Sequence, residues 1–554
     1  MKTQSVPGSE TLRFYLAFLL ILSIGAFLRL YQFPLQVLLD DEWHVIHQLL
    51  TRGPKELFLT FGHADFSIPL ALFYWLELKL LGLSETGMRW PMMLSGLLTL
   101  VVFPLYVRKF LGDRTTLIFA ALLAISPMLV IYSRTARPYA LTILISLVAL
   151  GMFHKFVEAK KSSWKPGLVY ALCAVSSVWL HLISLPMVVA PFLALGLPAL
   201  IGRDWGRIRR MWWLGIGTAV AMLALVLPPL LGHPEALAVK LGVKAPNLQT
   251  LYGAIHIWVG TTSLLVVLIG LSLAALGAGS LWRKIPLVSS LVTGLGLTLC
   301  VILLTQPAWV NHSLTLARYL LVVIPLLLLA IALGVSRVSN ALIQSWGSTG
   351  KLVSLFGIIS VLWLTIYYSP LHKILAKPNS NSMHSVYQFG FQEKHNLIAE
   401  YQQYFPVSPF WHLLASLPQD SIKIAAGPFY FETDNWDAAR WEQISLQRVM
   451  PGYLTGVCVE HRWGEVPMEK GYRFQNVGYL GAPENLVKRG FDLVVYQKPV
   501  TVMTNQGEVE LGNDTLTCEG ALRKLYQEPV YEDELLVVFP LSDSVRGQIH
   551  ALRD

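Results

Sequence analysis

The stretch Leu38-Leu39-Asp40-Asp41-Glu42-Trp43-His44 places three consecutive carboxylates just beyond the first long apolar segment of the chain. That segment, residues 12–31, has about the 20 apolar residues that a helix needs to cross a bilayer. The acidic stretch therefore lies where a first membrane span ends. We expect the later spans to be arranged so that this loop forms part of a reaction centre on the outer face of a helical bundle.

The composition is typical of a polytopic membrane protein. Of the 554 residues, 54% are hydrophobic and only 14% are charged, whereas a soluble domain has about 25% charged residues. The net charge is +9, but much of the basic excess falls in short loops between apolar segments. This pattern indicates membrane topology and attraction to anionic membrane lipids, and it argues against binding to nucleic acid.

The apolar segments predict about 11 transmembrane helices. They cover residues 12–31, 88–107, 115–132, 138–156, 167–182, 184–201, 212–231, 255–281, 285–305, 319–336 and 351–368. Between the first two, residues 66–83 form an apolar stretch that is interrupted by Pro69, Glu77 and Lys79. This interruption favours an interfacial or re-entrant helix in the first outer loop, with a full span as the alternative.

Basic residues orient the predicted spans because they gather in alternate loops. These are Lys2 and Arg13; Arg108, Lys109 and Arg114; Lys155, Lys160, Lys161 and Lys165; Arg203, Arg207, Arg209 and Arg210; Arg283 and Lys284; Arg337 and Lys351. By the positive-inside rule these loops face the cytoplasm. The loop with Asp41 and the C-terminal tail then lie outside. We predict a multi-pass protein of the cell inner membrane with an extracytoplasmic C-terminal domain.

The chain divides into a transmembrane domain, residues 1–370, and a polar tail, residues 371–554. Strand-like runs alternate with helical patterns in the tail, which predicts a small soluble α/β domain. The runs are residues 422–426, 491–496 and 534–539. The tail carries no G-x-G-x-x-G or P-loop fingerprint. Cys458 and Cys518 could pair if the tail lies in an oxidising compartment, and the sequence leaves this pairing open.

Asp41 and Glu42 are the candidate catalytic carboxylates. Neighbours on a helix point about 100° apart, so the two need not share a task. A carboxylate near hydrocarbon and shielded from water has a raised pKa, which makes it a usable general base. The alternative is a helix start, with Asp40 or Asp41 as the N-cap and an acidic first turn. Capping does not exclude catalysis.

Histidines in the first outer loop give a weaker signal. His44 and His47 have helical i,i+3 spacing, so one helix face could offer half of a divalent-metal site. An amphipathic interfacial helix with polar histidines is the favoured interpretation. His63 and Asp65 could line a pocket or be ordinary loop residues. We assign no metal ligand and no cofactor, and leave a requirement for a divalent cation open.

Arginines at the outer membrane edge are the second candidate feature. Arg134 and Arg137 lie between two predicted spans with almost no loop, and Arg318 lies at the start of a later span. An arginine at this edge contradicts the positive-inside rule. It could be explained by binding to a phosphate or a carboxylate, or by snorkelling of its side chain to the headgroups. Two such sites at one depth indicate an anionic ligand at headgroup level, with snorkelling as the alternative.

Four motifs in this order resemble those of the GT-C membrane glycosyltransferases that use a sugar on a lipid phosphate. The motifs are Asp41-Glu42; His63 through Pro69-Leu70, Tyr74-Trp75 and Leu81-Gly82 to Arg89-Trp90-Pro91; residues 132–141, Tyr-Ser-Arg-Thr-Ala-Arg-Pro-Tyr-Ala-Leu; and Arg318-Tyr319-Leu320-Leu321 with Pro325. The family includes protein O-mannosyltransferases, aminoarabinose transferases and lipopolysaccharide-core galacturonosyltransferases. The resemblance covers roughly residues 12–330. Two features depart from it: residues 66–68 interrupt the histidine motif, and Thr135 stands where relatives often have an acid.

The resemblance implies a polyprenyl-phosphate sugar donor. Its lipid tail would lie among the spans, and its phosphate would meet arginines. Arg137 and Arg318 are the first candidates for this role, followed by Arg134 and Arg89. Positive charge would stabilise the departing lipid phosphate.

The resemblance also implies an acceptor site. Asp41 would deprotonate an acceptor hydroxyl, which attacks the anomeric carbon and inverts it, and Glu42 would orient the acceptor or Asp41. Apart from the resemblance, His63, Asp65, Tyr139 and Tyr319 are the candidate residues of the acceptor site or pocket; the interruption at residues 66–68 prevents a safe transfer of the family's histidine to His63. The acceptor would be a glycan, a lipid or a protein.

Two other classes compete with this enzyme. A transporter or flippase of a lipid-linked anion also carries charged residues at membrane depth. Transporters often have internal repeats or helices broken at the midplane, whereas this sequence shows no internal repeat and its charges gather at one face. A non-catalytic assembly subunit is the third class, and in it the outer carboxylates would be dispensable.

Overall fold

A computed structural model of the chain describes residues 7–36, 38, 40–61, 67–159, 163–238, 240–371, 406–428, 437–454, 457–458, 471–504, 507–511 and 516–552. The chain forms two compact units. The first, which we call the helical unit, comprises Met1–Tyr31, Lys55–Leu70 and Arg89–His372. The second, which we call the mixed unit, comprises Gln32–Pro54, Ala71–Met88 and Lys373–Asp554. Two segments of the first outer loop thus group with the C-terminal part of the chain.

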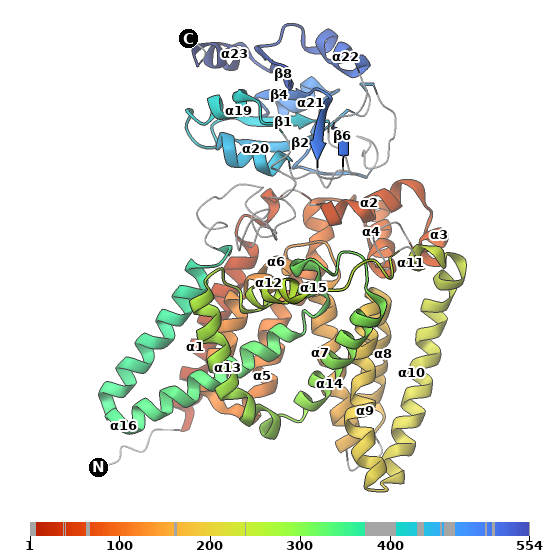
Figure 1. Cartoon of the computed structure of the whole chain (residues 1–554), viewed down its shortest axis with the longest axis vertical. Coiled ribbons are helices and arrows are strands. Elements are labelled where there is room, and N and C mark those ends of the chain that lie inside the picture. The colour runs from red at the N-terminus through yellow and green to blue at the C-terminus, as the bar shows by residue number, and fades with distance from the viewer. Residues whose placement is uncertain are drawn as a thin grey trace. The chain divides into compact units, whose positions relative to one another are not determined.

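The helical unit is built from long apolar helices and short helices between them (Figure 1). In chain order these are α1 (Pro7–Leu30), α3 (Pro54–Leu59), α5 (Glu85–Ile125), α6 (Pro127–Ser133), α7 (Tyr139–Glu158), α8 (Lys165–Leu180), η2 (Leu182–Ser184), α9 (Leu185–Ile201), α10 (Trp205–Gly232), α11 (Glu235–Ala238), α12 (Leu248–Val259), α13 (Leu264–Lys284), α14 (Leu287–Thr305), α15 (Ser313–Tyr319) and α16 (Val323–Tyr367). Within the described part of the chain, eight helices are long and apolar enough to cross a membrane: α1, α5, α7, α9 with η2, α10, α13, α14 and α16. The predicted polytopic helical architecture is confirmed.

Two of these helices each join two predicted spans. α5 contains Gly112 with φ 74°, and α16 contains Gly347 with φ 53°. Both values lie in the left-handed region, which glycine adopts without a side-chain clash, so each helix bends between its two apolar runs. α8 corresponds to a further predicted span but has only 16 residues. The count of 11 therefore stays a prediction.

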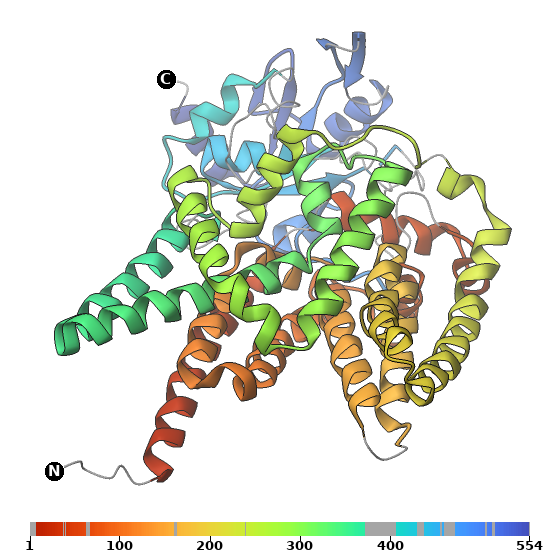
Figure 2. The same cartoon turned by 60° about the horizontal axis from the view of Figure 1, so that its bottom comes forward.

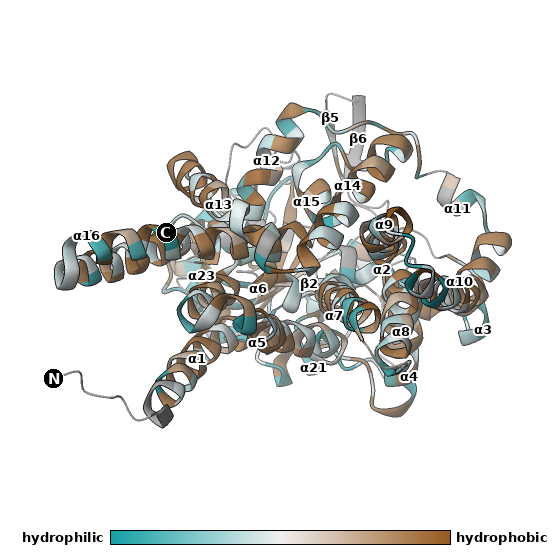
Figure 3. Ribbon diagram, turned by 90° about the horizontal axis from the view of Figure 1, so that it is seen from below, coloured by the Kyte–Doolittle hydropathy of each residue, from teal (hydrophilic) through white to brown (hydrophobic). Residues whose placement is uncertain are grey.

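The long helices pack in neighbouring pairs and leave apolar side chains on the outside. α7 packs against α8, α9 against α14, and α13 against α16, and these pairs can be followed in Figure 2. Hydrophobic residues make up much of the length of these helices (Figure 3). Leu16 of α1 and Phe356 of α16 are exposed by 58% and 75%. Apolar surface of this extent is covered by lipid in a membrane protein.

The mixed unit begins with the predicted first outer loop. It contains η1 (Phe33–Leu35), α2 (Asp40–Thr51), most of α4 (Ile68–Leu80) and the first turn of α5, residues 85–88. α4 has 13 residues, fewer than a helix needs to span the bilayer, as expected for the interfacial or re-entrant helix predicted here.

The C-terminal part of the mixed unit is an α/β domain around one sheet. Its elements are α19 (Pro409–Leu414), β1 (Lys423–Gly427), α20 (Asp437–Ser445), β2 (Arg448–Tyr453), β3 (Gly478–Tyr479), α21 (Pro483–Lys488), β4 (Leu493–Gln497), β5 (Val500–Thr504), β6 (Gly507–Leu511), α22 (Leu516–Tyr526), β7 (Tyr531–Glu532), β8 (Leu536–Pro540) and α23 (Asp543–Ala551). The sheet has the order β3-β2-β1-β4-β8-β7, and β5 pairs with β6 separately. β1 pairs in parallel with β2 and β4, whereas β8 is antiparallel to β4. The predicted α/β domain is confirmed.

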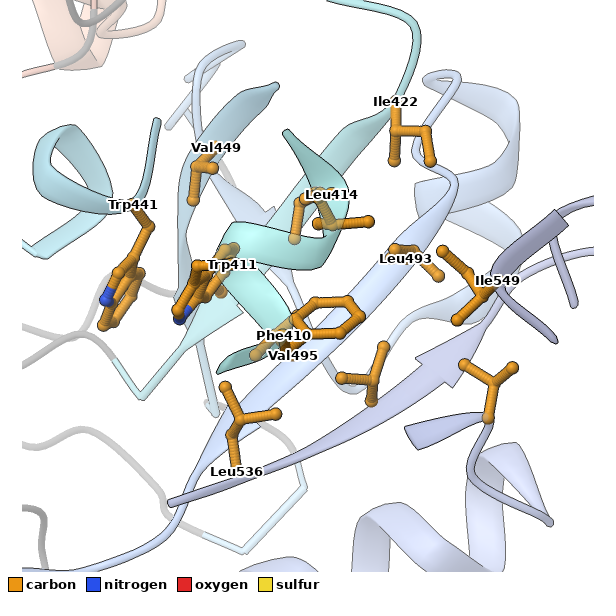
Figure 4. Close-up of a cluster of buried hydrophobic side chains, with 14 of the residues drawn as sticks. Phe410, Trp411, Leu414, Ile422, Trp441, Val449, Leu493, Val495, Leu536 and Ile549 are labelled. Carbon is orange, nitrogen blue, oxygen red and sulfur yellow. The ribbon is translucent and has the colours of Figure 1, made fainter. Parts of the chain in front are cut away.

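The sheet buries both faces, as its apolar strands require. Ile424 of β1 belongs to a core cluster with Trp411 and Trp441, whose rings stack at 4.9 Å (Figure 4). The next residue, Ala425, belongs to a second cluster with Met450 and Val494. Successive side chains of a strand point to opposite faces, so one run of apolar residues supplies both clusters.

A disulfide joins Cys458 to Cys518. Cys458 follows β2, and Cys518 lies in the first turn of α22 with its side chain buried in the second cluster. The bond closes a separation of 60 residues and resolves the pairing that the sequence left open.

Candidate functional site

The helical unit brings two of the predicted arginines to one tyrosine ring. Tyr139 is the first residue of α7, and Arg318 is the penultimate residue of α15. The guanidinium carbon of Arg318 is 5.8 Å from the centre of the Tyr139 ring, and that of Arg137 is 6.0 Å from it. Cations within about 6 Å of an aromatic ring are attracted to its face. Arg137, Tyr139 and Arg318, which belong to two motifs far apart in the sequence, therefore form one cluster.

The short link between α6 and α7 places Arg137 beside Tyr139. The backbone N–H of Arg137 donates to the carbonyl of Thr135 at 2.8 Å, and the Thr135 hydroxyl donates to the carbonyl of Ile131 at 2.9 Å. Pro138 follows with φ −67°, which suits the start of a helix. The rings of Tyr132 and Tyr139 meet edge to face at 4.7 Å. Hydrogen bonds and ring contacts among neighbouring residues therefore stabilise the conformation of this link.

A pocket opens at this cluster. Its polar lining residues are Tyr139, Thr142, Ser146, His181, Ser184, Thr298, Arg318 and Tyr319. They lie on α7, α14 and α15 and on the link between α8 and α9 that contains η2. The pocket thus combines one arginine, two tyrosines and several hydroxyls.

His181 is a pocket residue that the sequence did not single out. Its ring lies 5.5 Å from the Tyr139 ring and 6.0 Å from the Tyr319 ring. It is the C-cap residue of α8 and has an extended backbone with ψ 112°. The available signal was a single histidine near the end of the predicted span 167–182, and this histidine has no periodic or motif context.

Arg134 occupies a different environment from Arg137. Its Nη1 donates to the carbonyl oxygens of Leu28 at 3.2 Å and Tyr31 at 2.7 Å, at the end of α1. A helix leaves its last carbonyls without partners inside the helix, so Arg134 satisfies two of them. This role gives Arg134 a structural reason to be at this depth.

Arg89 lies near Arg134 and is completely buried. Burial is the main cause that lowers the pKa of Arg134 to about 9, and the charge of Arg89 lowers it further. Two buried guanidinium groups in one place favour negative charge nearby.

Arg29 is a buried arginine that the sequence analysis overlooked. Its Nη1 donates to the carbonyls of Gly25 at 2.9 Å and Ala124 at 3.0 Å, its Nη2 to Leu123 at 3.3 Å, and its Nε to the Ser133 hydroxyl at 3.3 Å. Arg29 therefore ties the end of α1 to the C-terminal carbonyls of α5. The sequence signal for Arg29 was its charge near the end of the apolar segment 12–31.

The predicted catalytic carboxylates lie in the mixed unit. Asp40, Asp41 and Glu42 form the first turn of α2. Acidic residues in a first turn interact favourably with the positive end of the helix dipole, which fits the helix-start alternative. Glu42 is completely buried, and so is the neighbouring Trp43. A glutamate that only interacts with the helix dipole can stay exposed to solvent, so the helix start alone does not explain why Glu42 is buried.

The histidines of the first outer loop do not form a metal cluster in the part that is described. His47 is buried and His44 is half-buried. Over the described ranges, no group of three or more His, Cys, Asp and Glu side chains could hold a metal ion. His63 and Asp65 lie outside the described residues, so their assignment to the acceptor pocket stays a prediction.

Part of the helical unit matches a known protein family. Residues 67–231 match the model of the family "Dolichyl-phosphate-mannose-protein mannosyltransferase". The match covers less than a third of the chain, and it includes Arg89, the link with Arg137 and Tyr139, and His181. It supports the resemblance to the GT-C glycosyltransferases that the sequence motifs indicated. No curated protein matches the chain.

Several solved structures match this chain at low sequence identity. ArnT from Cupriavidus metallidurans in the apo state has 13% identity and a TM-score of 0.48 over 97% of this chain and 99% of that one. The same protein bound to undecaprenyl phosphate has 13% identity and a TM-score of 0.46 over 98% and 99%. The archaeal oligosaccharyltransferase AglB from Archaeoglobus fulgidus, in complex with an inhibitory peptide and a dolichol-phosphate, has 11% identity and a TM-score of 0.38 over 91% and 75%. At these identities and TM-scores, no residue's role is transferred from these structures to this chain.

Proposed function

We propose that this protein transfers a sugar from a polyprenyl-phosphate donor to an acceptor hydroxyl at the outer face of the cytoplasmic membrane. The observation that carries the proposal is the approach of Arg137 and Arg318 to Tyr139 at the pocket that Arg318 and Tyr139 line. Guanidinium groups bind phosphate through paired N–H donors. Charge that develops on the departing lipid phosphate would be stabilised by the same groups.

The lining of the pocket supports a sugar as its ligand. The hydroxyls of Thr142, Ser146 and Ser184 line it together with the rings of Tyr139 and Tyr319. Ligand sites typically combine aromatic and apolar walls with a few polar groups that fix orientation. Hydroxyls can donate to or accept from the hydroxyls of a sugar, and the tyrosine rings offer flat apolar faces.

Asp41 is the proposed general base, and the transfer would invert the anomeric carbon. The Asp41 carboxylate takes the proton of the acceptor hydroxyl, the oxygen of that hydroxyl forms the new glycosidic bond, and the bond to the lipid phosphate breaks. Polyprenyl phosphate leaves with the electron pair of that bond. Glu42, which is buried beside Asp41 on α2, orients the acceptor or Asp41.

The disulfide supports an extracytoplasmic position of the C-terminal domain. Disulfides such as Cys458–Cys518 form and persist in oxidising compartments and are rare in the cytosol. The positive-inside pattern leads independently to the same side. An acceptor on this side would be an envelope glycan, a lipid or a protein.

Transfer by the purified protein tests this proposal. Protein in detergent is incubated with labelled polyprenyl-phosphate sugars, one hexose or pentose donor at a time, and with extracted envelope material as the acceptor. We expect release of polyprenyl phosphate and label in the acceptor fraction, without a membrane gradient. Movement of the lipid-linked sugar across vesicle membranes, with no transfer from any donor, would favour the flippase instead.

A further inference from the structure

The mixed unit contains a clamp between segments that are almost 400 residues apart in the sequence. Glu85 is 2% exposed, and both of its carboxylate oxygens accept hydrogen bonds. Oε1 accepts from the backbone N–H groups of Gln475 at 2.9 Å and Asn476 at 2.7 Å, and Oε2 accepts from Gln475 at 3.1 Å. Two successive N–H groups that point at one carboxylate form an anion nest. Glu85 therefore anchors residues 471–477, which we call the strap.

The strap also pairs with the link before Glu85 through its backbone. The N–H of Leu83 donates to the carbonyl of Gly471 at 2.5 Å, and the N–H of Arg473 donates to the carbonyl of Leu83 at 2.7 Å. Gly471 has φ 103°, and a β-carbon there would lie 2.9 Å from the carbonyl oxygen of Leu78. Only glycine fits this approach without displacement.

The side chain of Asn476 reaches the segment that precedes the acidic stretch. It is 3% exposed, and its Nδ2 donates to the carbonyls of Pro34 at 2.8 Å and Gln36 at 3.3 Å. Both carbonyls belong to the segment just N-terminal to α2. One buried amide therefore fixes the backbone from which the helix with Asp41 starts.

Trp43, which follows Asp41 in the sequence, packs against the C-terminal domain and holds α2. Its ring is 1% exposed and lies 5.5 Å from the ring of Tyr453 and 5.7 Å from that of Phe474, a strap residue. Its Nε1 donates to the carbonyl of Leu38 at 3.2 Å. The segment from Gln36 to Trp43, which includes Asp41, is thus held at both ends by the C-terminal domain.

The strap itself is tied to the sheet. The Arg489 guanidinium donates to the carbonyls of Gln475 at 2.5 Å and Val477 at 2.8 Å, and Val477 leads directly into β3. The clamp is therefore continuous from the sheet through the strap to α2.

We propose that the strap is a positioning element for the general base, with Glu85 and Asn476 as positioning residues. This inference rests on the proposed function. A 12-residue helix is only marginally stable by itself in water, so α2 needs outside contacts to hold one conformation. A misplacement of about 1 Å can cost about 100-fold in rate. The C-terminal domain would thus act in catalysis by holding Asp41 in place.

Two clamp variants and one control test the inference in the full-length protein. Asn476→Ala removes the donor to Pro34 and Gln36, and Glu85→Gln replaces one acceptor oxygen by an NH₂ group. Gln419→Ala removes an exposed amide of the same domain and serves as the control. We expect kcat of both clamp variants to fall about 10- to 100-fold with the donor KM within about twofold, and Gln419→Ala to match the wild type.

Hydrogen exchange supplies a readout that does not depend on activity. Amides of residues 40–51 should exchange faster in both clamp variants, while those of residues 139–158 should not change. A wild-type protein that transfers no sugar overturns the proposed function, whereas the exchange result still reports on the clamp.

Activity and exchange together decide the positioning role. If the wild type transfers sugar and either folded clamp variant keeps its kcat, the positioning role is overturned, whatever the exchange shows. If Asn476→Ala does not fold, the more conservative Glu85→Gln decides alone by the same criteria. Faster exchange at residues 40–51 together with the loss of kcat supports the role.

Discussion

The guanidinium carbon of Arg318 lies 5.8 Å from the ring centre of Tyr139. Both residues line the same pocket, whereas Arg137 approaches the ring without lining it. This difference ranks Arg318 ahead of Arg137 as the group that contacts the donor phosphate. It also separates both residues from Arg134, whose guanidinium is bonded to the end of α1.

Arg318→Lys should weaken donor binding. Lysine keeps the positive charge but loses the planar fork that binds phosphate through two N–H donors. We expect KM for the polyprenyl-phosphate sugar to rise about tenfold, equivalent to about 1.4 kcal/mol, as measured by donor titration. Arg207→Lys, at an exposed ion pair with Asp204, is the matched control. An unchanged donor KM in Arg318→Lys would remove Arg318 from the phosphate site.

Arg29→Met should destabilise the helical unit without changing donor binding. Methionine has a similar length but leaves the carbonyls of Leu123 and Ala124 without the donors that Arg29 supplies. Hydrogen bonds to charged groups contribute about 1.5–3 kcal/mol each, so the apparent Tm in detergent should fall by roughly 5 °C or more. Arg108→Met, which removes a partly exposed ion pair with Asp113, should change Tm little. Equal Tm changes in the two variants would contradict the assigned role of Arg29.

Glu77→Gln should change the pH dependence of stability. Burial raises the pKa of Glu77 from its ordinary 4.5 to about 7. Because the folded-state pKa is the higher one, the contribution of Glu77 to stability is complete below pH 4.5 and is lost as pH rises through 7. Solvent screening of this half-buried group reduces the effect to about 1–2 kcal/mol.

The apparent Tm at several pH values measures the effect of Glu77. Glu77→Gln should be more stable than the wild type at pH 8 and equal to it near pH 4.5. Glu484→Gln, at an exposed position of α21, should follow the wild type at every pH. A constant difference between Glu77→Gln and the wild type would show that Glu77 stays ionised in the folded protein.

Removal of the Cys458–Cys518 disulfide should destabilise the mixed unit. A cross-link over 60 residues typically stabilises by about 2–4 kcal/mol, mainly by constraining the unfolded chain. The Cys458→Ser, Cys518→Ser double variant should therefore unfold at a lower temperature, and dithiothreitol should lower the Tm of the wild type but not of the variant. Cys300→Ser, at a free exposed cysteine, is the control. A wild-type Tm that dithiothreitol leaves unchanged would argue that the two thiols are not joined in the purified protein.

The elements that the sequence predicted well are those with long apolar runs. Each predicted strand of the tail lies within one or two residues of β1, β4 or β8, because these strands are buried on both faces. β2 escaped prediction because its sequence, Arg-Val-Met-Pro-Gly-Tyr, contains proline and glycine, which argue against a strand interior. The kinks at Gly112 and Gly347 depend on local backbone angles that hydropathy does not report.

The candidate site was only partly accessible to sequence reasoning. Arg137 and Arg318 stood out because their charge contradicts the expected topology, but Arg134 gave the same signal and is bonded to helix carbonyls. The two environments differ only in three-dimensional contacts, since a carbonyl at a helix end and a phosphate oxygen both accept N–H donors. The contact of Glu85 with Asn476 spans 391 positions and has no local sequence signature.

The turnover of Asp41→Asn tests the central claim most directly. Asparagine keeps the size of the side chain, and the loss of one carboxylate from the first turn of α2 costs at most about 1 kcal/mol, but asparagine has no basic oxygen. With donor and acceptor at saturation, we expect kcat to fall about 10²- to 10⁴-fold, with wild-type Tm, while Asp40→Asn stays close to wild type. Full activity in both variants would contradict the assignment of the general base to this loop.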